Sequence, residues 1–169
     1  MAKLEISDDC FAPRKYVALT FKGKDPWVVI EQIAGSLRGF FHLERGQWNM
    51  YRINWDASED TIFFFARWWV ARHFSEYSAM HLEIKTQGYF NKNTRDGEFW
   101  LEFEGTVRTH FHTFGSILKP FWYLYSYLFY NNAKRSYVEQ CRAMTLSFRD
   151  TVKKKYGLQS GPELAAVVD

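Results

Sequence analysis

Residues 79–112, AMHLEIKTQGYFNKNTRDGEFWLEFEGTVRTHFH, contain two alternating segments on either side of a polar run. Alternation of apolar and polar residues is typical of a half-buried strand, and residues 91–97 are turn formers. Each strand has one apolar face, with Met80, Leu82, Ile84 and Phe90 on the first, and Phe99, Leu101, Phe103, Val107 and Phe111 on the second. The stretch therefore predicts an antiparallel hairpin with one buried face.

The pairing of these strands is limited by their apolar faces, because a slip of one residue turns every side chain to the other face. Pairing Phe90 with Phe99 joins the two apolar faces and also sets Lys85 opposite Glu104. Opposite charges in such cross-strand positions are favourable. We expect this register in the folded chain.

The segments around the hairpin complete an α+β pattern. Asp25 and Pro26 are typical of a helix start, and Gly157 of a helix end. The other expected elements, in chain order, are a strand (14–24), a helix (25–41), two strands (47–55 and 63–74) and, after the hairpin, a long helix (119–157). This order, β-α-β4-α, predicts a curved antiparallel sheet of about five strands wrapped on the C-terminal helix. Residues 1–158 are expected to form a single domain and residues 159–169 a flexible tail.

The composition indicates one globular domain with many large rings. Of the 169 residues, 47% are apolar and 20% aromatic, so the rings must fill a core, line a cavity or form an interface. The formal charge of +3 is too small to indicate nucleic-acid binding, which needs a concentrated basic face.

Three features favour a soluble, cytoplasmic protein. Cys10 and Cys141 are too few for a disulfide framework or a Cys-rich zinc site, and we expect free thiols in a reducing compartment. The first ten residues, MAKLEISDDC, lack the apolar core of a signal peptide. The longest nearly unbroken apolar run, residues 121–130, is about half the length of a membrane span, so no transmembrane segment is expected.

The order of elements over residues 14–157 resembles the helix-grip architecture of the START and polyketide-cyclase-like (SRPBCC-type) superfamily. This resemblance implies a curved sheet that wraps the last helix and encloses an apolar cavity. It lies in the order of elements alone, so no family site residue is carried over. TATA-binding-protein domains share the succession but bind DNA on a sheet face, and hot-dog thioesterases share the strand–helix start but usually lack the long closing helix.

The segment FFFARWWVARHF, residues 63–74, supplies the expected pocket wall. Its more apolar face, which includes Phe64 and Trp68, carries only one charge, Arg72, and should turn toward the closing helix. Arg72 is either an anion clamp at the pocket mouth or a rim residue paired with an acid. The predicted ligand-binding set is Phe64, Trp68, Arg72, Leu82, Ile84, Leu101, Phe103, Tyr127 and Tyr130.

Two other surfaces are candidate interfaces. The opposite face of the sheet is expected to align Phe65, Tyr89 and Trp100, which either bind a partner or lie under the N-terminal segment CFAP. In the uncharged run 120–133, four side chains point away from the expected sheet: Phe121, Leu124, Leu128 and Phe129. A dimer partner, a second sheet edge or a membrane could cover them. We favour a homodimer, because basic residues are not concentrated nearby.

Signs of catalysis are weak. The sequence has no Gly-rich phosphate loop, no nucleophile elbow and no Cys–His pair close in sequence. The histidines expected on the outer sheet face, His73, His81 and His110, lie around Arg108, and a cation among neutral imidazoles disfavours a metal site. We therefore assign no catalytic residue, no metal ligand and no cofactor.

These observations favour the binding of an apolar or amphipathic small molecule in a cavity between the sheet and the C-terminal helix. The alternative is a protein-interaction or homodimerisation module with a packed interior and no ligand.

Overall fold

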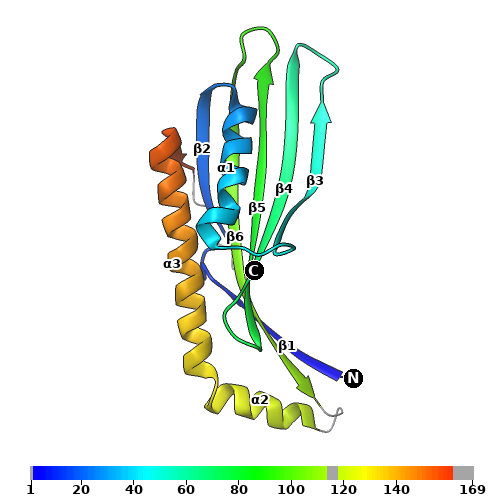
Figure 1. Cartoon of the computed structure of the whole chain (residues 1–169), viewed down its shortest axis with the longest axis vertical. Coiled ribbons are helices and arrows are strands. Elements are labelled where there is room, and N and C mark those ends of the chain that lie inside the picture. The colour runs from blue at the N-terminus through cyan, green and yellow to red at the C-terminus, as the bar shows by residue number, and fades with distance from the viewer. Residues whose placement is uncertain (1, 114–117, 162–169) are drawn as a thin grey trace.

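The computed structural model describes residues 2–113 and 118–161 and has an α+β fold built on one large antiparallel sheet (Figure 1). Its elements are β1 (Ala2–Asp9), β2 (Val17–Lys24), α1 (Pro26–Phe41), β3 (Trp48–Asp56), β4 (Thr61–His73), β5 (Ser78–Asn91), β6 (Asp96–Thr113), α2 (Lys119–Leu128), α3 (Asn131–Tyr156) and β7 (Gln159–Ser160). The expected α+β class, antiparallel sheet and C-terminal helix are confirmed. The described residues form seven strands rather than about five.

The strand order is β3-β4-β5-β6-β2-β7, and β1 pairs with the second half of β6, beyond the part that pairs with β2. The hairpin of β5 and β6 is present, but its register differs by two residues from the expected one. Phe90 pairs with Gly97, and Phe99 pairs with Gly88. A shift of two residues keeps every side chain on its face, so alternation alone does not distinguish the two registers.

The inner face of the sheet is the face that α1 and α3 cover. Apolar residues of α1 recur at helical spacing and are buried against it, namely Ile30, Ile33, Leu37 and Phe41. From α3, Phe148 packs with its ring centroid 5.2 Å from Phe41 and 6.0 Å from Phe103 of β6. One continuous core therefore joins the sheet and both helices. Asp25 precedes α1 as expected, but its carboxylate pairs with Arg95 and makes no capping bond.

The expected single C-terminal helix is two helices. The chain turns at Phe129 and Tyr130, and α2 extends away from α3 beyond the sheet (Figure 1). Phe129, Tyr130, Asn131 and Asn132 are all poorer helix formers than leucine or alanine, which favours a break at this point. Because of the turn, Tyr123 and Tyr127 do not pack against the inner face of the sheet, and both are exposed.

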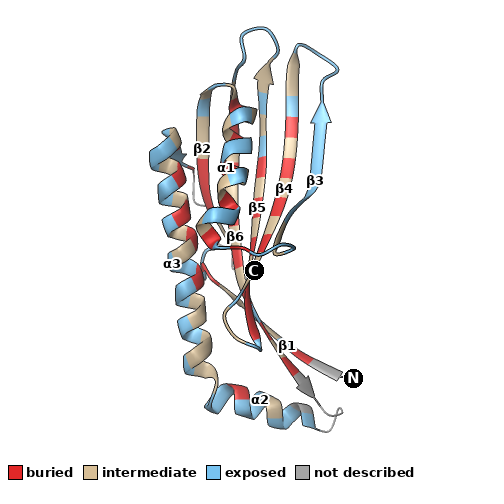
Figure 2. Ribbon diagram, in the orientation of Figure 1, coloured by how far each residue is buried: buried red, intermediate tan, exposed pale blue. Residues whose placement is uncertain are grey.

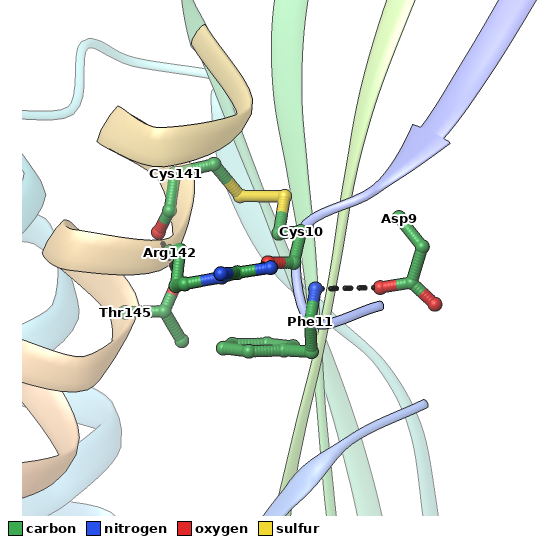
Figure 3. Close-up of a disulfide and its surroundings, with 6 residues drawn as sticks. All are labelled: Asp9, Cys10, Phe11, Cys141, Arg142 and Thr145. Atoms are coloured by element: carbon green, nitrogen blue, oxygen red, sulfur yellow. Dashed lines mark hydrogen bonds between the residues drawn. A yellow bond between two sulfur atoms is a disulfide. The ribbon is translucent and has the colours of Figure 1, made fainter. Parts of the chain in front are cut away.

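Cys10 and Cys141 form a disulfide, which corrects the expectation of free thiols (Figure 3). Both residues are fully buried between β6 and α3. Gly105 of β6 allows this approach, because a Cβ there would lie 3.2 Å from Cys141 Sγ and 3.3 Å from Cys10 Cβ. Arg142 strengthens the link by donating hydrogen bonds to the carbonyl oxygens of Cys10 and Ala12.

The disulfide also bears on the expected compartment. Disulfides persist mainly in oxidising environments, so the thiol argument for a cytoplasmic location no longer holds, and the location stays a prediction. None of the described helices is both long enough and apolar enough to span a membrane.

The chain ends differ from expectation in two places. Residues 2–9 form β1, a strand that was not predicted, and Cys10 and Phe11 enter the core. Residues 159–161, expected to be loose, pair with β2, and Gly161 is buried against Ala18. Residues 162–169 of the expected tail lie outside the described residues.

Candidate functional site

The predicted ligand-binding residues separate into three groups. Six of them belong to the packed core and are at most 4% exposed: Phe64, Trp68, Leu82, Ile84, Leu101 and Phe103. Arg72 is half-buried, and its Nη1 lies 3.7 Å from Met144 Sδ of α3. Among the described residues, no carboxylate forms an ion pair with it. Tyr130 lies at the α2–α3 turn, and its hydroxyl is 3.0 Å from Ser75 Oγ and 3.1 Å from Ser78 Oγ. Tyr127 is 73% exposed on α2.

The outer face of the sheet carries a groove of about 870 Å³. It lies where Thr20, Trp100, Gln87, Phe65 and Asn54 form one cross-strand row. The next row consists of Lys22, Glu98, Tyr89, Phe63 and Asp56, and Gln159 of β7 adjoins Thr20 at the β2 side. Alternation turns all these side chains away from α1 and α3. We name this set of residues the outer groove.

All three rings that were expected on this face line the outer groove, but in two rows rather than one. Phe65 and Trp100 flank Gln87, while Tyr89 lies in the next row beside Phe63, with ring centroids 5.9 Å apart. The two-residue register difference explains the displacement of Tyr89. Cys10 and Phe11 are buried in the core, so the segment CFAP does not provide the cover proposed for these rings.

Polar groups are placed among the rings. The Tyr89 hydroxyl donates to Glu98 Oε1 at 2.9 Å, and this bond raises the pKa of the phenol. The Ser58 hydroxyl and backbone N–H donate to Asp56 and lower the pKa of its carboxyl. The indole nitrogen of Trp100, in contrast, is buried and has no acceptor among the described residues. An unpaired buried donor of this kind costs roughly 1–3 kcal/mol.

A band of ion pairs separates the outer groove from the rest of the outer face. Arg67 pairs with Glu83, and Lys85 Nζ lies 2.6 Å from Glu104 Oε2. The expected Lys85–Glu104 contact is present, although Glu102 is the residue directly opposite Lys85. Arg67 is directly opposite Lys85 on β4.

A second, smaller hollow of about 490 Å³ lies beyond this band. It is lined by residues that include Trp69, His81 and Arg108. Burial, followed by the nearby charges of Arg108, His110 and His73, lowers the pKa of His81. Within residues 2–113 and 118–161, no group of three or more His, Cys, Asp or Glu side chains is arranged to hold a metal ion.

The four residues predicted to need cover on the C-terminal helix are exposed, three of them on α2 and Phe129 directly after it. Figure 2 shows α2 as mostly exposed, and the exposed fractions are 61% for Phe121, 55% for Leu124, 58% for Leu128 and 73% for Phe129. The structure does not bring these side chains near the outer groove. They form a separate surface at the other end of β6.

Sequence reasoning missed several groove residues. The alternation that selected Phe65 would also have predicted other outward-facing side chains, once the neighbouring strands were aligned. These are Lys22, Asn54, Phe63 and Gln87. Gln159 carried no such signal, because two residues are too few to show a strand period.

Comparisons with known proteins give no family. No protein-family model and no curated protein matches the chain. One solved structure, an uncharacterised protein from Rhizobium leguminosarum, aligns over 92% of this chain and 99% of its own length with 8% identity. Its TM-score of 0.22 is too low to carry any argument about fold or function.

Proposed function

We propose that this protein binds an elongated apolar or amphipathic small molecule in the outer groove. The observation that carries the proposal is the groove itself, an aromatic-lined hollow of about 870 Å³ that runs across the strands from Gln159 to Asn54. Ligand sites typically measure roughly 300–1,000 Å³ and combine an apolar lining with a few polar groups. The ligand class is the one expected from the sequence, but the proposed site lies on the opposite side of the sheet.

The chemistry of the groove indicates what kind of ligand fits. Phe63, Phe65 and Trp100 offer ring surface, while the side-chain amides of Asn54 and Gln87 can donate and accept hydrogen bonds. Two carboxylates and one ammonium group line the same space, so the site has no excess positive charge for a strongly anionic ligand. A ligand with an apolar body and an uncharged polar end matches these groups.

The helix-grip resemblance is part of the same proposal. Its support is the antiparallel sheet closed by a C-terminal helix. The seven strands and the separate α2 are departures from the expected β-α-β4-α order.

A fluorescent apolar probe, N-phenyl-1-naphthylamine, tests the site. Gln87 is exposed between Phe65 and Trp100, so Gln87→Trp fills the groove without disturbing the core. We expect the wild type to bind the probe and Gln87→Trp to bind it at least ten-fold more weakly. Trp69→Ala is the matched control, because Trp69 is a half-exposed ring on the same face outside the groove.

Two results would overturn the proposed site. The first is the absence of probe binding by the wild type, and the second is unchanged binding by Gln87→Trp. If Trp69→Ala weakened probe binding instead, the binding site would be the smaller hollow and not the outer groove. Native mass spectrometry of the purified protein would report a carried ligand directly.

Homodimerisation is the second candidate, and β3 is the observation that favours it. This nine-residue strand is an edge of the sheet, and its Met50, Ile53 and Trp55 are 42–47% exposed. A long exposed apolar edge strand can pair with another chain. Light scattering should then give twice the monomer mass, and Ile53→Lys should restore the monomer. A monomeric wild type would exclude this candidate.

A further inference from the structure

The helix α2 has an exposed surface that the proposed ligand site leaves unexplained. Residues 120–133 contain no charged side chain. Trp122 and the buried Ser126 turn toward the sheet, where the Trp122 ring stacks on Phe111 with centroids 5.6 Å apart. The other α2 side chains whose burial the structure describes are exposed, and all of them except Pro120 are aromatic or leucine.

The exposed part of α2 is wider than one protein contact requires. With 3.6 residues per turn, the arc from Tyr123 through Leu124, Leu128 and Phe121 to Phe129 covers roughly 240°. A helix that packs on one protein surface needs an apolar stripe of roughly 100°. A medium that surrounds a protruding helix on several sides matches this arc better than a single partner.

Side chains are sorted along that arc. Its centre is formed by Phe121, Leu124 and Leu128, which have no polar atoms. Tyr123 and Tyr127 lie on one flank, and Tyr125, followed by Phe129, lies on the other. Tyrosine is enriched where a bilayer meets water, because its ring is apolar and its hydroxyl reaches the headgroup layer. The order of side chains is therefore that of a helix lying in a membrane surface.

The charges near α2 favour an anionic surface only weakly. No acidic residue occurs between Glu104 and Glu139, while Lys119 begins α2 and Lys134 and Arg135 follow it. Lys134 pairs with Asp8 of β1 at 3.1 Å, and Arg135 is exposed. Glu76, in the β4–β5 turn, is an exposed acid at this end of the sheet. The net attraction is therefore modest, and apolar insertion supplies most of the binding.

We propose that α2 attaches this protein to the interfacial layer of a lipid bilayer containing anionic lipids. Phe121, Leu124 and Leu128 enter the layer, the tyrosines lie at headgroup level, and the cations at the two ends of the helix contact lipid phosphates. The attachment is peripheral, because ten residues of helix cannot span the hydrocarbon core. This inference does not depend on the outer groove, from which α2 is separate.

Vesicle flotation tests the proposal with the full chain. Vesicles of phosphatidylcholine with one quarter phosphatidylglycerol should carry the wild type upward in a density gradient. Leu124→Gln with Leu128→Gln keeps good helix formers on an exposed face and should weaken binding at least ten-fold. Val28→Gln with Met50→Gln is the matched control, because these apolar side chains are 40% and 42% exposed away from α2. Circular dichroism checks that both variants are folded.

The contribution of charge to membrane binding is tested by comparing anionic vesicles with vesicles of pure phosphatidylcholine. Binding to pure phosphatidylcholine should be roughly thirty-fold weaker, given about two contributing cations at about 1 kcal/mol each. Lys119→Gln with Arg135→Gln should remove that difference.

Three results would overturn the membrane proposal. The first is that the wild type floats with neither kind of vesicle. The second is that the double leucine variant floats as well as the wild type. The third is that the wild type is a soluble dimer and the double leucine variant a monomer. The last result would assign α2 to a second copy of the chain.

Discussion

Phe63 and Phe64 are neighbours in β4, yet Phe63 is 52% exposed on the outer face and Phe64 is 3% exposed on the inner face. The same contrast extends across the sheet. The inner face is continuous with α1 and α3 in one core, whereas the outer face leaves rings, ion pairs and two hollows at the surface. The many aromatic rings of this protein therefore have two physical roles. The inner rings stabilise the fold, and the outer rings are available for binding.

The first test concerns the disulfide that holds α3 against the inner face. Cys10 and Cys141 are 131 residues apart, and the loop-entropy relation assigns such a link about 5 kcal/mol. We expect Cys10→Ala with Cys141→Ala to lower the free energy of unfolding by about 2–5 kcal/mol in a denaturant titration. Adding a reductant to the wild type should give a similar loss. Equal stability of the oxidised and reduced protein would contradict this role.

A matched pair of phenylalanines tests the contrast between the faces directly. Phe103 is fully buried on the inner face against Phe148, so Phe103→Ala should cost about 3–5 kcal/mol of unfolding free energy. Phe63→Ala on the outer face should cost less than about 1 kcal/mol, since surface substitutions are usually mild. Urea titrations of both variants provide the measurement. Similar losses at the two positions would mean that the outer rings also stabilise the fold.

A glycine and its neighbour in β5 provide a finer test. A Cβ at Gly88 would overlap the Glu98 carbonyl oxygen and lie 2.6 Å from Phe99 Cβ and 2.7 Å from Phe64 Cζ. We expect Gly88→Ala to lower stability by about 1–3 kcal/mol through overpacking of the inner face. Gln87→Ala, one residue earlier and exposed, should change stability by less than about 0.5 kcal/mol. Thermal melts of both variants provide the measurement. An unchanged melting temperature for Gly88→Ala would contradict the tight inner packing.

The sequence was sufficient to predict which side chains share a face of the sheet. It was not sufficient to predict the register between neighbouring strands. Alternation assigned Leu82, Ile84 and Phe103 to the buried side, because burial has the same two-residue period as the strand. The same period cannot detect a shift by two residues, so Tyr89 was placed in the row of Phe65 when it belongs to that of Phe63.

Features that join distant parts of the chain could not be predicted from local sequence patterns. The disulfide joins residues far apart in the chain, and only the folded backbone brings Gly105 under both sulfurs. The turn at Tyr130 was missed because the apolar residues of α2 and α3 follow one helical stripe without interruption. The outer groove was missed as a hollow, since its shape depends on six strands together, although three of its rings were identified.

The smallest expected effect concerns the outer face and pH. The pKa of His81 lies below its ordinary value because of burial and then Arg108, so folding favours the neutral ring. The stabilising contribution is therefore complete above the unfolded pKa of about 6.5 and is lost as the pH falls toward the folded value. Between pH 8 and pH 5, the wild type should lose more stability than His81→Gln in urea titrations. Arg108→Gln should narrow this difference, because it removes a nearby cation. Parallel stability curves for the wild type and His81→Gln would show that this histidine is titrated equally in the folded and unfolded chains.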